Sequence, residues 1–426
     1  MARCSKTLPQ GNDATQHLSL GILALNFPTV RIQEIIKDCD RCSQRVRDLP
    51  AVVVVFYILA LSLFPGVGYE SVLRWLLTGL QWFGNKNLRI SGKGALSAAR
   101  TRLGEAPLKS LFEKMALPMA DPHLRGCFWK GLHLVAWDGS TLALQDTKTV
   151  SEEFGRSSNQ HGQSAWPQAR FVALVEIGTH LIFAAALGGY RASEIGLAHE
   201  LVGELKTGML CLADRLFPGF ELWQQASAQG AHLLWRVKIG LALKPVEVLS
   251  DGSYLADWLP ESGQRKQQKP VRVRVIEYRL QSNPKVQEPR SRAEAETYRL
   301  MTTILDPSFA SATELAQLYP ERWEIELSIK ETKTGMRCGM ATLRSKTPKL
   351  VRQEFWGLLL AHHAVRKTMA LAALEVDKDP DRLSFAKCIE IVKTTQTGPV
   401  LSFPPSKKSS HPAPSATRHG GQQGGK

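Results

Sequence analysis

The chain has 426 residues, of which 43% are hydrophobic and 22% are charged. This ordinary globular composition excludes a disordered protein, a collagen-like repeat and a coiled-coil rod, and at roughly 100–200 residues per domain the length suggests two to four domains. The 54 Lys and Arg residues outnumber the 39 Asp and Glu residues, giving a formal charge of +15, so a polyanionic partner is favoured: nucleic acid first, an anionic membrane second.

Residues 1–25 are predicted to be a flexible N-terminus without a secretory signal, because they lack a clean apolar segment and a cleavage site. The most hydrophobic stretch is 49–64. At about 16 residues it is shorter than the roughly 20 needed to cross a bilayer, and Pro65-Gly66 ends it. We predict a buried core helix here; the lack of charge in the stretch leaves a membrane segment as the alternative.

Seven cysteines are too few for a disulfide scaffold, and their odd number also argues against one, so a reducing cytoplasm is the better fit. Cys39 and Cys42 form the one CxxC pair. A zinc ribbon needs a second pair at a suitable spacing, and none follows. The favoured interpretation is therefore two incidental cysteines.

Residues 26–125 show apolar side chains at helical spacing and are predicted to form an all-helical N-terminal domain. Lys93, Arg100 and Arg102 lie close together on one predicted helix. They predict a basic, DNA-binding face for this domain. A solvated helix surface is the alternative, since surface arginines commonly have that role.

The pattern changes to a mixed α/β sheet over residues 126–237. Asp138-Gly139 stands between two apolar runs and predicts the turn of a β-hairpin. The chain then predicts two further strands, a helix and a fully apolar strand that ends at Asp214. The predicted elements are strands at 133–137, 141–144, 170–176 and 180–187, a helix at 192–205 and a strand at 209–213.

Residues 238–305 are β-rich, and 271–279 alternate apolar and charged side chains with a period of two. Arg272, Arg274 and Arg279 on this ribbon predict a DNA-facing surface; an edge strand protected by charges is weighted equally.

Helical patterns return over 306–400. The last segment, 401–426, is rich in Ser, Pro, Gly, His and Gln and cannot bury a core, which predicts a disordered basic tail.

Asp138 and Asp214 each follow an apolar strand of the predicted sheet, and functional groups in open α/β sheets gather beyond the carboxyl ends of strands. Each also has a local interpretation. Asp138 can be the first residue of a hairpin turn, and Asp214 can be a helix N-cap.

A polar stripe is predicted if residues 319–333 are helical, because Arg322 and Glu326 are then i,i+4 neighbours and Lys333 lies two turns from Glu326. Residues 323–330 alternate polar and apolar side chains, however, which is typical of a strand. Pro320 and the good helix formers favour a helix. Periodicity alone leaves both structures open.

At these residues the sequence resembles the DDE transposases of the bacterial insertion-sequence 4 (IS4) type. Their signature Tyr-x2-Arg-x3-Glu-x6-Lys is matched at every position by Tyr319, Arg322, Glu326 and Lys333. The resemblance spans most of residues 30–395. It includes Trp-Asp-Gly-Ser around Asp138, Ala-Asp-Arg around Asp214 and Asp-Pro-Asp-Arg-Leu-Ser-Phe at 379–385.

The resemblance implies an RNase H-like core that carries Asp138, Asp214 and Glu326, is interrupted by the β-rich insertion and follows the helical N-terminal domain. It implies a helix at Glu326. It also implies that the three carboxylates are catalytic and hold two Mg²⁺ ions, with Mn²⁺ as a substitute. DNA contacts are implied for Tyr319, Arg322, Lys333 and Arg215, while Trp258 or Tyr298 could stack on an extruded base, with buried core aromatics as the favoured alternative.

The implied function is a bacterial cytoplasmic, nucleoid-associated transposase that is not bound to a membrane. It would bind double-stranded DNA at the inverted repeats of an insertion sequence, pair as a synaptic dimer, and perform cut-and-paste cleavage and strand transfer into target DNA. The unusual tail motivates a second hypothesis, a catalytically decayed DNA-binding copy. A third is a metal-dependent nuclease with an RNase H-like core. A Ser or Cys hydrolase is poorly supported, since no GxSxG motif is present.

Overall fold

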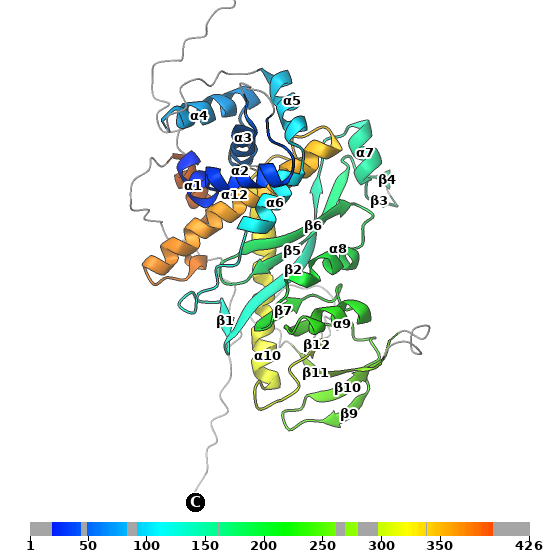
Figure 1. The fold of residues 1–426 in the computed structure, drawn as a ribbon. Coiled ribbons are helices and arrows are strands. Elements are labelled where there is room, and N and C mark those ends of the chain that lie inside the picture. The colour runs from blue at the N-terminus through cyan, green and yellow to red at the C-terminus, as the bar shows by residue number, and fades with distance from the viewer. Residues whose placement is uncertain are drawn as a thin grey trace, which may run out of the picture.

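The computed structural model describes residues 19–43, 49–82, 92–160, 162–260, 269–279, 297–337 and 339–394. Residues 1–18 of the predicted flexible N-terminus and the whole predicted basic tail lie outside these ranges. Residues 19–25 are helical and bury Ile22 and Leu23 in the core, so the prediction of a flexible segment is wrong for them. A helical layer lies at one end of the molecule and a long twisted sheet extends away from it (Figure 1). The first helices are α1 (Ser19–Asn26), α2 (Thr29–Asp38), α3 (Ala51–Leu63), α4 (Tyr69–Trp82), α5 (Lys93–Leu103) and α6 (Ala106–Met115).

Helix α3 confirms the prediction of a buried core helix at 49–64. Every residue from Val53 to Leu63 is buried. The helix packs against the long helix α12 (Pro348–Glu375), and the contact is close at Gly357, where an added Cβ would lie 2.5 Å from Ile58 Cγ2. Within the described part of the chain, no helix has the length and apolar character needed to span a membrane.

Helices α1–α6 do not pack as a unit of their own beside the sheet, which corrects the prediction that residues 26–125 form a domain separate from it. Their buried side chains form one continuous hydrophobic core with α12 and with one face of the sheet. Helix α12 lies between the two and contacts α3 on one side and strand β6 (Leu181–Gly189) on the other. The apolar face of the early helices is therefore covered by residues far along the chain.

The central part of the sheet has the order β6-β5-β2-β7-β8. The first three strands are antiparallel in chain order, whereas β7 runs parallel to β2 and β8 runs parallel to β7. This is the RNase H-like arrangement that the resemblance implied. The strands are β2 (Leu132–Ala143), β5 (Gln168–Glu176), β6 (Leu181–Gly189), β7 (Met209–Ala213) and β8 (His232–Arg236), with β1 (Phe128–Trp129) paired to β2.

The predicted hairpin at Asp138-Gly139 is wrong, because β2 continues straight through both residues. Strand β5 supplies the antiparallel partner for both halves of β2, pairing Asp138 with Ala173 and Gly139 with Val172. A Cβ at position 139 would lie 2.6 Å from the side-chain carboxyl carbon of Glu194, so the Glu194 side chain would have to move to accommodate a larger residue.

Two layers of helices cover the sheet (Figure 1). Helices α8 (Glu194–Leu201) and α9 (Phe220–Ala228) pack on one face through a second hydrophobic core, and the early helices and α12 cover the other face. Alternate residues of β2 divide between these cores: Val135 and Trp137 face α8 and α9, and Leu134 and Ala136 face the opposite side. Asp138 lies on the same face of β2 as Leu134 and Ala136.

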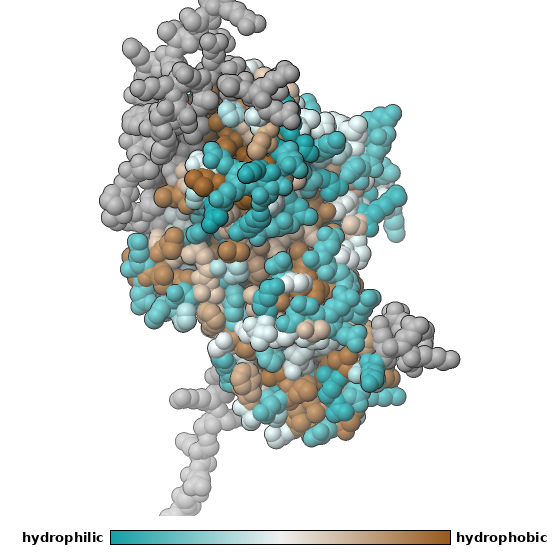
Figure 2. Space-filling model, in the orientation of Figure 1, coloured by the Kyte–Doolittle hydropathy of each residue, from teal (hydrophilic) through white to brown (hydrophobic). Residues whose placement is uncertain are grey.

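The β-rich region 238–305 extends the same sheet. Strand β12 pairs with β8, and the order continues β8-β12-β11-β10-β9. Its strands are β9 (Pro245–Val248), β10 (Tyr254–Trp258), β11 (Val271–Arg279) and β12 (Thr297–Thr302). The edge strand is β9, whose Val246 and Val248 are exposed, and the lower lobe in Figure 2 shows hydrophobic surface where this insertion lies.

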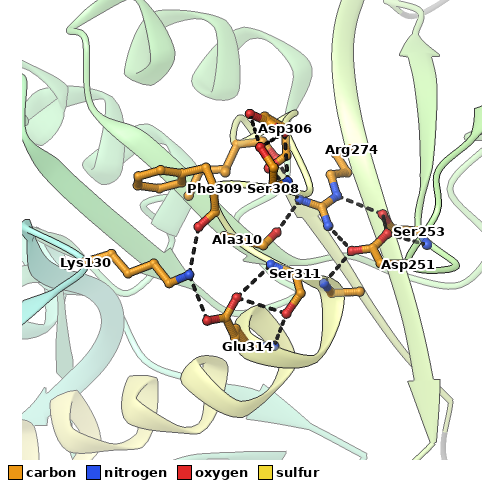
Figure 3. A network of polar contacts seen from close by, with 12 residues as sticks. Lys130, Asp251, Ser253, Arg274, Asp306, Ser308, Phe309, Ala310, Ser311 and Glu314 are labelled. Carbon is orange, nitrogen blue, oxygen red and sulfur yellow. Dashed lines mark hydrogen bonds and ion pairs between the residues drawn. The ribbon is translucent and has the colours of Figure 1, made fainter.

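Arg274 corrects the prediction that the arginines of 271–279 face DNA together. Its side chain is fully buried and reaches from β11 to the loop before α10 (Ala312–Leu318) (Figure 3). It donates to Ser253 Oγ at 2.8 Å and to the carbonyl of Ala310 at 2.7 Å, and it pairs with Asp251 at 2.5 Å.

Arg272 and Arg279 are exposed on the same strand, and Arg272 pairs with Asp257 at 2.6 Å. Because β11 lies between β10 and β12, the alternative of a charge-protected edge strand is also wrong.

The residues that were ambiguous between strand and helix are helical. A 3₁₀ turn (Tyr319–Trp323), helix α11 (Glu324–Lys330) and a π-helical turn (Glu331–Gly335) follow α10 without interruption. After α12 come a short 3₁₀ turn (Pro380–Arg382) and helix α13 (Phe385–Thr394). The shorter elements elsewhere are α7 (Lys148–Phe154), β3 (Ser158–Asn159), β4 (Gly162–Gln163) and a 3₁₀ turn (Val202–Glu204).

Candidate active site

Asp138 and Asp214 stand at equivalent positions on neighbouring parallel strands. The last register pair of β2 and β7 is Ala136 with Leu212, and each aspartate lies two residues beyond it. The Asp138 carboxylate accepts a hydrogen bond from Gly139 N at 2.7 Å, and that of Asp214 accepts one from Leu216 N at 2.7 Å. Each local bond accounts for only one carboxylate oxygen.

Glu326 approaches Asp138 from helix α11, and Arg322 lies between them. Arg322 Nη2 donates to Glu326 Oε1 at 2.9 Å, and Arg322 Nη1 lies 3.5 Å from Asp138 Oδ2. The two carboxylates are therefore close enough to share one guanidinium group. The i,i+4 spacing predicted from the sequence brings Arg322 and Glu326 together, whereas the contact with Asp138 joins segments 184 residues apart.

Asp138 is a buried carboxylate with two other carboxylates near it. Burial raises the pKa of Asp138 to about 7, with Gly139 N–H and Arg322 lowering it and the charges of Asp214 and Glu326 raising it further. Asp214 is thus near enough to interact electrostatically with Asp138. A cation would stabilise the ionised form of such a buried carboxylate.

Arg322 is buried but has unused hydrogen-bonding capacity. Its side chain is 6% exposed. Among the described residues, no partner is found for its Nε. Its guanidinium also lies 4.8 Å from the ring of Trp323, which is 55% exposed. Because the Nε is buried and Arg322 does not line the cleft over this site, the guanidinium bridges Asp138 and Glu326 from behind them.

Lys333 reaches the same strand face as Asp138. Its Nζ donates to Ser140 Oγ at 2.9 Å. Burial, and then the nearby charge of Arg337, lower the pKa of Lys333. Ser140 was not identified from the sequence; the signal was its place two residues after Asp138, which puts both side chains on one face of a strand.

Tyr319 does not face the open site, which corrects its predicted DNA contact. Its side chain is buried, and its hydroxyl donates to the carbonyl of Ala213 at 3.1 Å. Burial also raises the pKa of its hydroxyl. Tyr319 therefore connects the helical segment 319–335 to the end of β7, directly beside Asp214.

An open cleft of about 1180 Å³ lies over these groups. Its walls come from β2 and from the segment around α11, and the residues that matter for the chemistry are Asp138, Ser140, Trp323, Glu326 and Lys333.

The other basic residues predicted to bind DNA separate into buried and exposed groups. Arg100 is 5% exposed, and its guanidinium donates to Gln353 Oε1 at 2.9 Å and to Ser345 Oγ at 3.0 Å. It joins α5 to α12, so its prediction as a surface DNA contact is wrong. Lys93 and Arg102 are exposed.

Arg102 and Arg41 both line a cavity of about 190 Å³ among the early helices. Arg215 is exposed directly after Asp214. Helices α1–α6 and their connections therefore retain exposed basic residues, although Arg100 is not one of them.

The insertion aromatics are packed inside the protein. Trp258 is 5% exposed and lies edge-on to Phe220, with ring centroids 5.3 Å apart, as the favoured core interpretation expected. Tyr298 is partly buried between Arg236, at 4.0 Å, and the stacked ring of Tyr278, at 5.4 Å.

Three carboxylates supply the donor set that a hard divalent cation prefers. Asp138, Asp214 and Glu326 offer only oxygen atoms, and Arg322 already occupies the space between two of them as a positive group. The donor chemistry suits Mg²⁺ or Mn²⁺, although the three carboxylates are not all within 4.8 Å of one another; among the described residues that spacing is found at His180, Glu324 and Asp381. Cys39 and Cys42 are free thiols, and among the described residues they belong to no group with metal-binding geometry.

Comparison with known proteins gives matches along most of the chain. Residues 17–113 match the family model described as insertion element 4 transposase N-terminal, and residues 129–363 match the model described as transposase DDE domain. The chain is 29% identical over 366 residues to the transposase InsG for insertion sequence element IS4 of Escherichia coli (strain K12), covering 85% of this chain and 79% of that protein.

Among solved structures, the chain is similar to piggyBac transposase in a synaptic complex with hairpin DNA. The sequence identity is 12% and the TM-score is 0.44, over 89% of this chain and 80% of that one. The match to the DDE domain includes Asp138, Asp214 and Glu326.

Proposed function

The chain belongs to the IS4-type family of DDE transposases, and on that basis we propose that it binds the ends of an insertion sequence and performs cut-and-paste transposition. Membership in this family means an enzyme that acts on DNA with the help of a divalent metal. The proposal goes further in assigning two Mg²⁺ ions to Asp138, Asp214 and Glu326. The supporting observation is that Asp138 and Glu326 converge on one guanidinium while Asp214 lies at the matching strand end.

The chemistry requires an activated oxygen and a stabilised leaving oxygen. When bound, a pair of divalent ions supplies both in an in-line displacement at phosphorus. The protein needs no covalent nucleophile of its own. Its carboxylates hold the ions, and the cleft leaves space for the scissile phosphate beside them.

Arg322 and Lys333 are proposed to contact the phosphates of the bound DNA end. Arg322 lies between Asp138 and Glu326, and Lys333 lines the cleft with its ammonium bonded to Ser140 Oγ. Arginine suits bidentate phosphate contact and lysine provides a point charge. Tyr319 is proposed to position the helix instead, through its bond to Ala213.

DNA beyond the cleaved end is proposed to lie against exposed basic residues, including Lys93 and Arg102 of α5 and Arg215 beside the cleft. A net charge of +15 supports binding to a polyanion, with an affinity that falls steeply with salt. We further propose that two copies pair the two inverted repeats in a synaptic dimer. The substrate would place the protein at the bacterial nucleoid.

The test uses a duplex that carries the inverted repeats flanking the gene. Wild-type protein should cleave it in Mg²⁺ and join the product to a target plasmid. Glu326→Gln should lose cleavage and keep DNA binding in the presence of a chelator. Glu113→Gln is the control, because Glu113 is an exposed carboxylate on a helix, pairs with Lys109 and does not line the cleft.

Normal cleavage by Glu326→Gln would contradict the assignment of this residue. Wild-type binding without cleavage would instead support a decayed DNA-binding copy, and cleavage without joining would support a nuclease.

A further inference from the structure

The helical segment 319–335 carries a second set of charged residues. Glu324 and Glu331 precede Glu326 and Lys333 by two residues each. Glu331 is largely buried against helix α12, whereas Glu324 contacts His180 and also lines the cleft. The proposed function does not explain why two carboxylates should be placed there.

Glu331 is held by helix α12. Its carboxylate accepts a hydrogen bond from Arg366 Nε at 2.8 Å, a second, short one from Arg366 Nη2, and lies 3.1 Å from His362 Nε2. Burial alone would raise the pKa of Glu331, but Arg366 and His362 lower it to about 2. Glu331 begins the π-helical turn that carries Lys333, so α12 fixes the start of that turn.

Glu324 is held by His180 and Asp381. His180 Nε2 lies 3.0 Å from Glu324 Oε2 and 2.9 Å from Asp381 Oδ1. His180 Nδ1 also lies 2.7 Å from Arg366 Nη2. The imidazole is thus enclosed by two carboxylates and a guanidinium, and these contacts join Glu324, Asp381 and Arg366 through one buried side chain.

Two features show that the protein constrains this network. His180 is 2% exposed and adopts the left-handed conformation, with φ of 59°, which is unfavourable for a residue with a side chain. The ring of Phe385 lies 5.3 Å from the guanidinium of Arg366, and a Cβ added to Gly335 would lie 3.2 Å from that ring. Asp381 and Phe385 both come from residues 379–385, the segment that resembles the family and had no assigned role.

We propose that His180, Glu331, Arg366 and Asp381 are positioning residues that hold the back of the helical segment so that Glu326 and Lys333 point into the cleft. The network joins that segment to the turn before β6, to α12 and to the 379–385 segment. π-Helical turns occur frequently at functional sites, and here one such turn contains both Glu331 of the network and Lys333. This inference rests on the proposed function of Glu326 and Lys333.

The test uses Arg366→Lys and Asp381→Asn. Lysine keeps the charge of Arg366 but cannot form the forked contact with Glu331. Asp381 is 41% exposed, so its replacement should leave the protein folded. Arg352→Lys is the matched control, because Arg352 lies on the same helix and forms a partly exposed pair with Glu153 at 2.8 Å.

Two quantities are measured: the affinity for Mn²⁺ without DNA, by electron paramagnetic resonance, and the single-turnover rate of end cleavage. Groups that orient metal ligands typically contribute about 10–100-fold to metal affinity or activity. We expect losses of that size for Arg366→Lys and Asp381→Asn, partial recovery in Asp381→Glu, and no change for Arg352→Lys. In a Glu326→Gln background, Asp381→Asn should add little further loss of Mn²⁺ affinity, because the network would act through Glu326.

The outcomes separate this inference from the function on which it rests. If Glu326→Gln binds Mn²⁺ as tightly as wild type, the proposed function fails. If Glu326→Gln loses Mn²⁺ affinity while Arg366→Lys and Asp381→Asn keep wild-type affinity and cleavage, the function stands and the positioning network is overturned.

Discussion

Two arginines, one in the insertion and one in the cleft, are equally hidden from solvent and differently bonded. Arg274 is fully buried, and its guanidinium contacts two side chains and three carbonyl groups around the loop before α10. Arg322 is 6% exposed and contacts two carboxylates, one of them at 3.5 Å, and its Nε has no partner among the described residues. All three side-chain nitrogens of Arg274 have hydrogen-bond partners, whereas one side-chain nitrogen of Arg322 has none among the described residues.

This difference separates a structural arginine from one available to a ligand. Buried polar groups in folded proteins are nearly always hydrogen-bonded, so an exception requires an explanation. At Arg274 the protein supplies every partner, and the insertion becomes anchored to the segment that carries Glu326 (Figure 3). At Arg322 the guanidinium lies between Asp138 and Glu326, and it is these two carboxylates that line the open cleft.

The largest expected effect is on stability at Arg274. Arg274→Met should lower the free energy of unfolding by about 3–5 kcal/mol, because it leaves the charge of Asp251 and several carbonyl groups without a partner. Arg322→Met should cost about 1 kcal/mol or less, since Asp138 can take up a proton and Glu326 is 44% exposed.

Urea denaturation in a chelating buffer measures both values. Equal losses for the two variants would show that Arg322 is as structural as Arg274 and would break the comparison.

The ionised form of Asp138 should destabilise the folded protein at high pH. Its pKa is raised from 3.8 when unfolded to about 7 when folded. A raised carboxyl pKa stabilises the fold below the unfolded pKa, and that contribution is lost as the pH rises through the folded pKa. Without metal, Asp138→Asn should therefore raise the free energy of unfolding by about 4 kcal/mol at pH 8, since each pKa unit corresponds to about 1.4 kcal/mol, and by less than about 1 kcal/mol at pH 4.

The control for this prediction is Asp257→Asn, since Asp257 is an exposed carboxylate paired with Arg272. It should give no such gain at pH 8. A gain for Asp138→Asn that is the same at both pH values would mean that packing, and not the ionisation of Asp138, is responsible.

The sequence predicted the elements and the signature residues better than it predicted their surroundings. The strand-like alternation at 323–330 shows why. Ile325 and Ile329 are buried, whereas Trp323 and Leu327 are exposed, and each pair has i,i+4 spacing. The helix therefore has an apolar face toward the core and another toward solvent, and the two together imitate a period of two.

The predictions that failed concern residues whose partners lie far away in the sequence. Asp138-Gly139 did not turn because β5 pairs with β2 on both sides of it. Arg100 and Arg274 are buried because their partners lie elsewhere in the chain, at Gln353 and at the carbonyl of Ala310 respectively. Local patterns cannot distinguish such an arginine from one on the surface.

A smaller effect is expected at Lys333. If its ammonium contacts one phosphate, Lys333→Ala should reduce the salt slope of end binding, the change in log affinity per unit of log salt concentration, by about 0.9. Binding measured between roughly 50 and 200 mM salt in chelator would show a change of about threefold across that range. Lys387→Ala is the control, because Lys387 is exposed and pairs with Glu390. An unchanged slope for Lys333→Ala would exclude the phosphate contact.

The smallest expected effect is at Arg272, two residues from Arg274 on the same strand. Its pair with Asp257 is 42% and 40% exposed, although the separation is only 2.6 Å. Water screens this pair and solvates either partner when the other is removed, so Arg272→Ala should cost between about 0 and 1 kcal/mol in urea denaturation. Together with Arg274→Met, this substitution compares two arginine–aspartate pairs of similar length on one strand. If Arg272→Ala lowered the free energy of unfolding as much as Arg274→Met, contact distance and not burial would determine how much such a pair stabilises the fold. The expected difference between Arg274 and Arg322 would then need another cause.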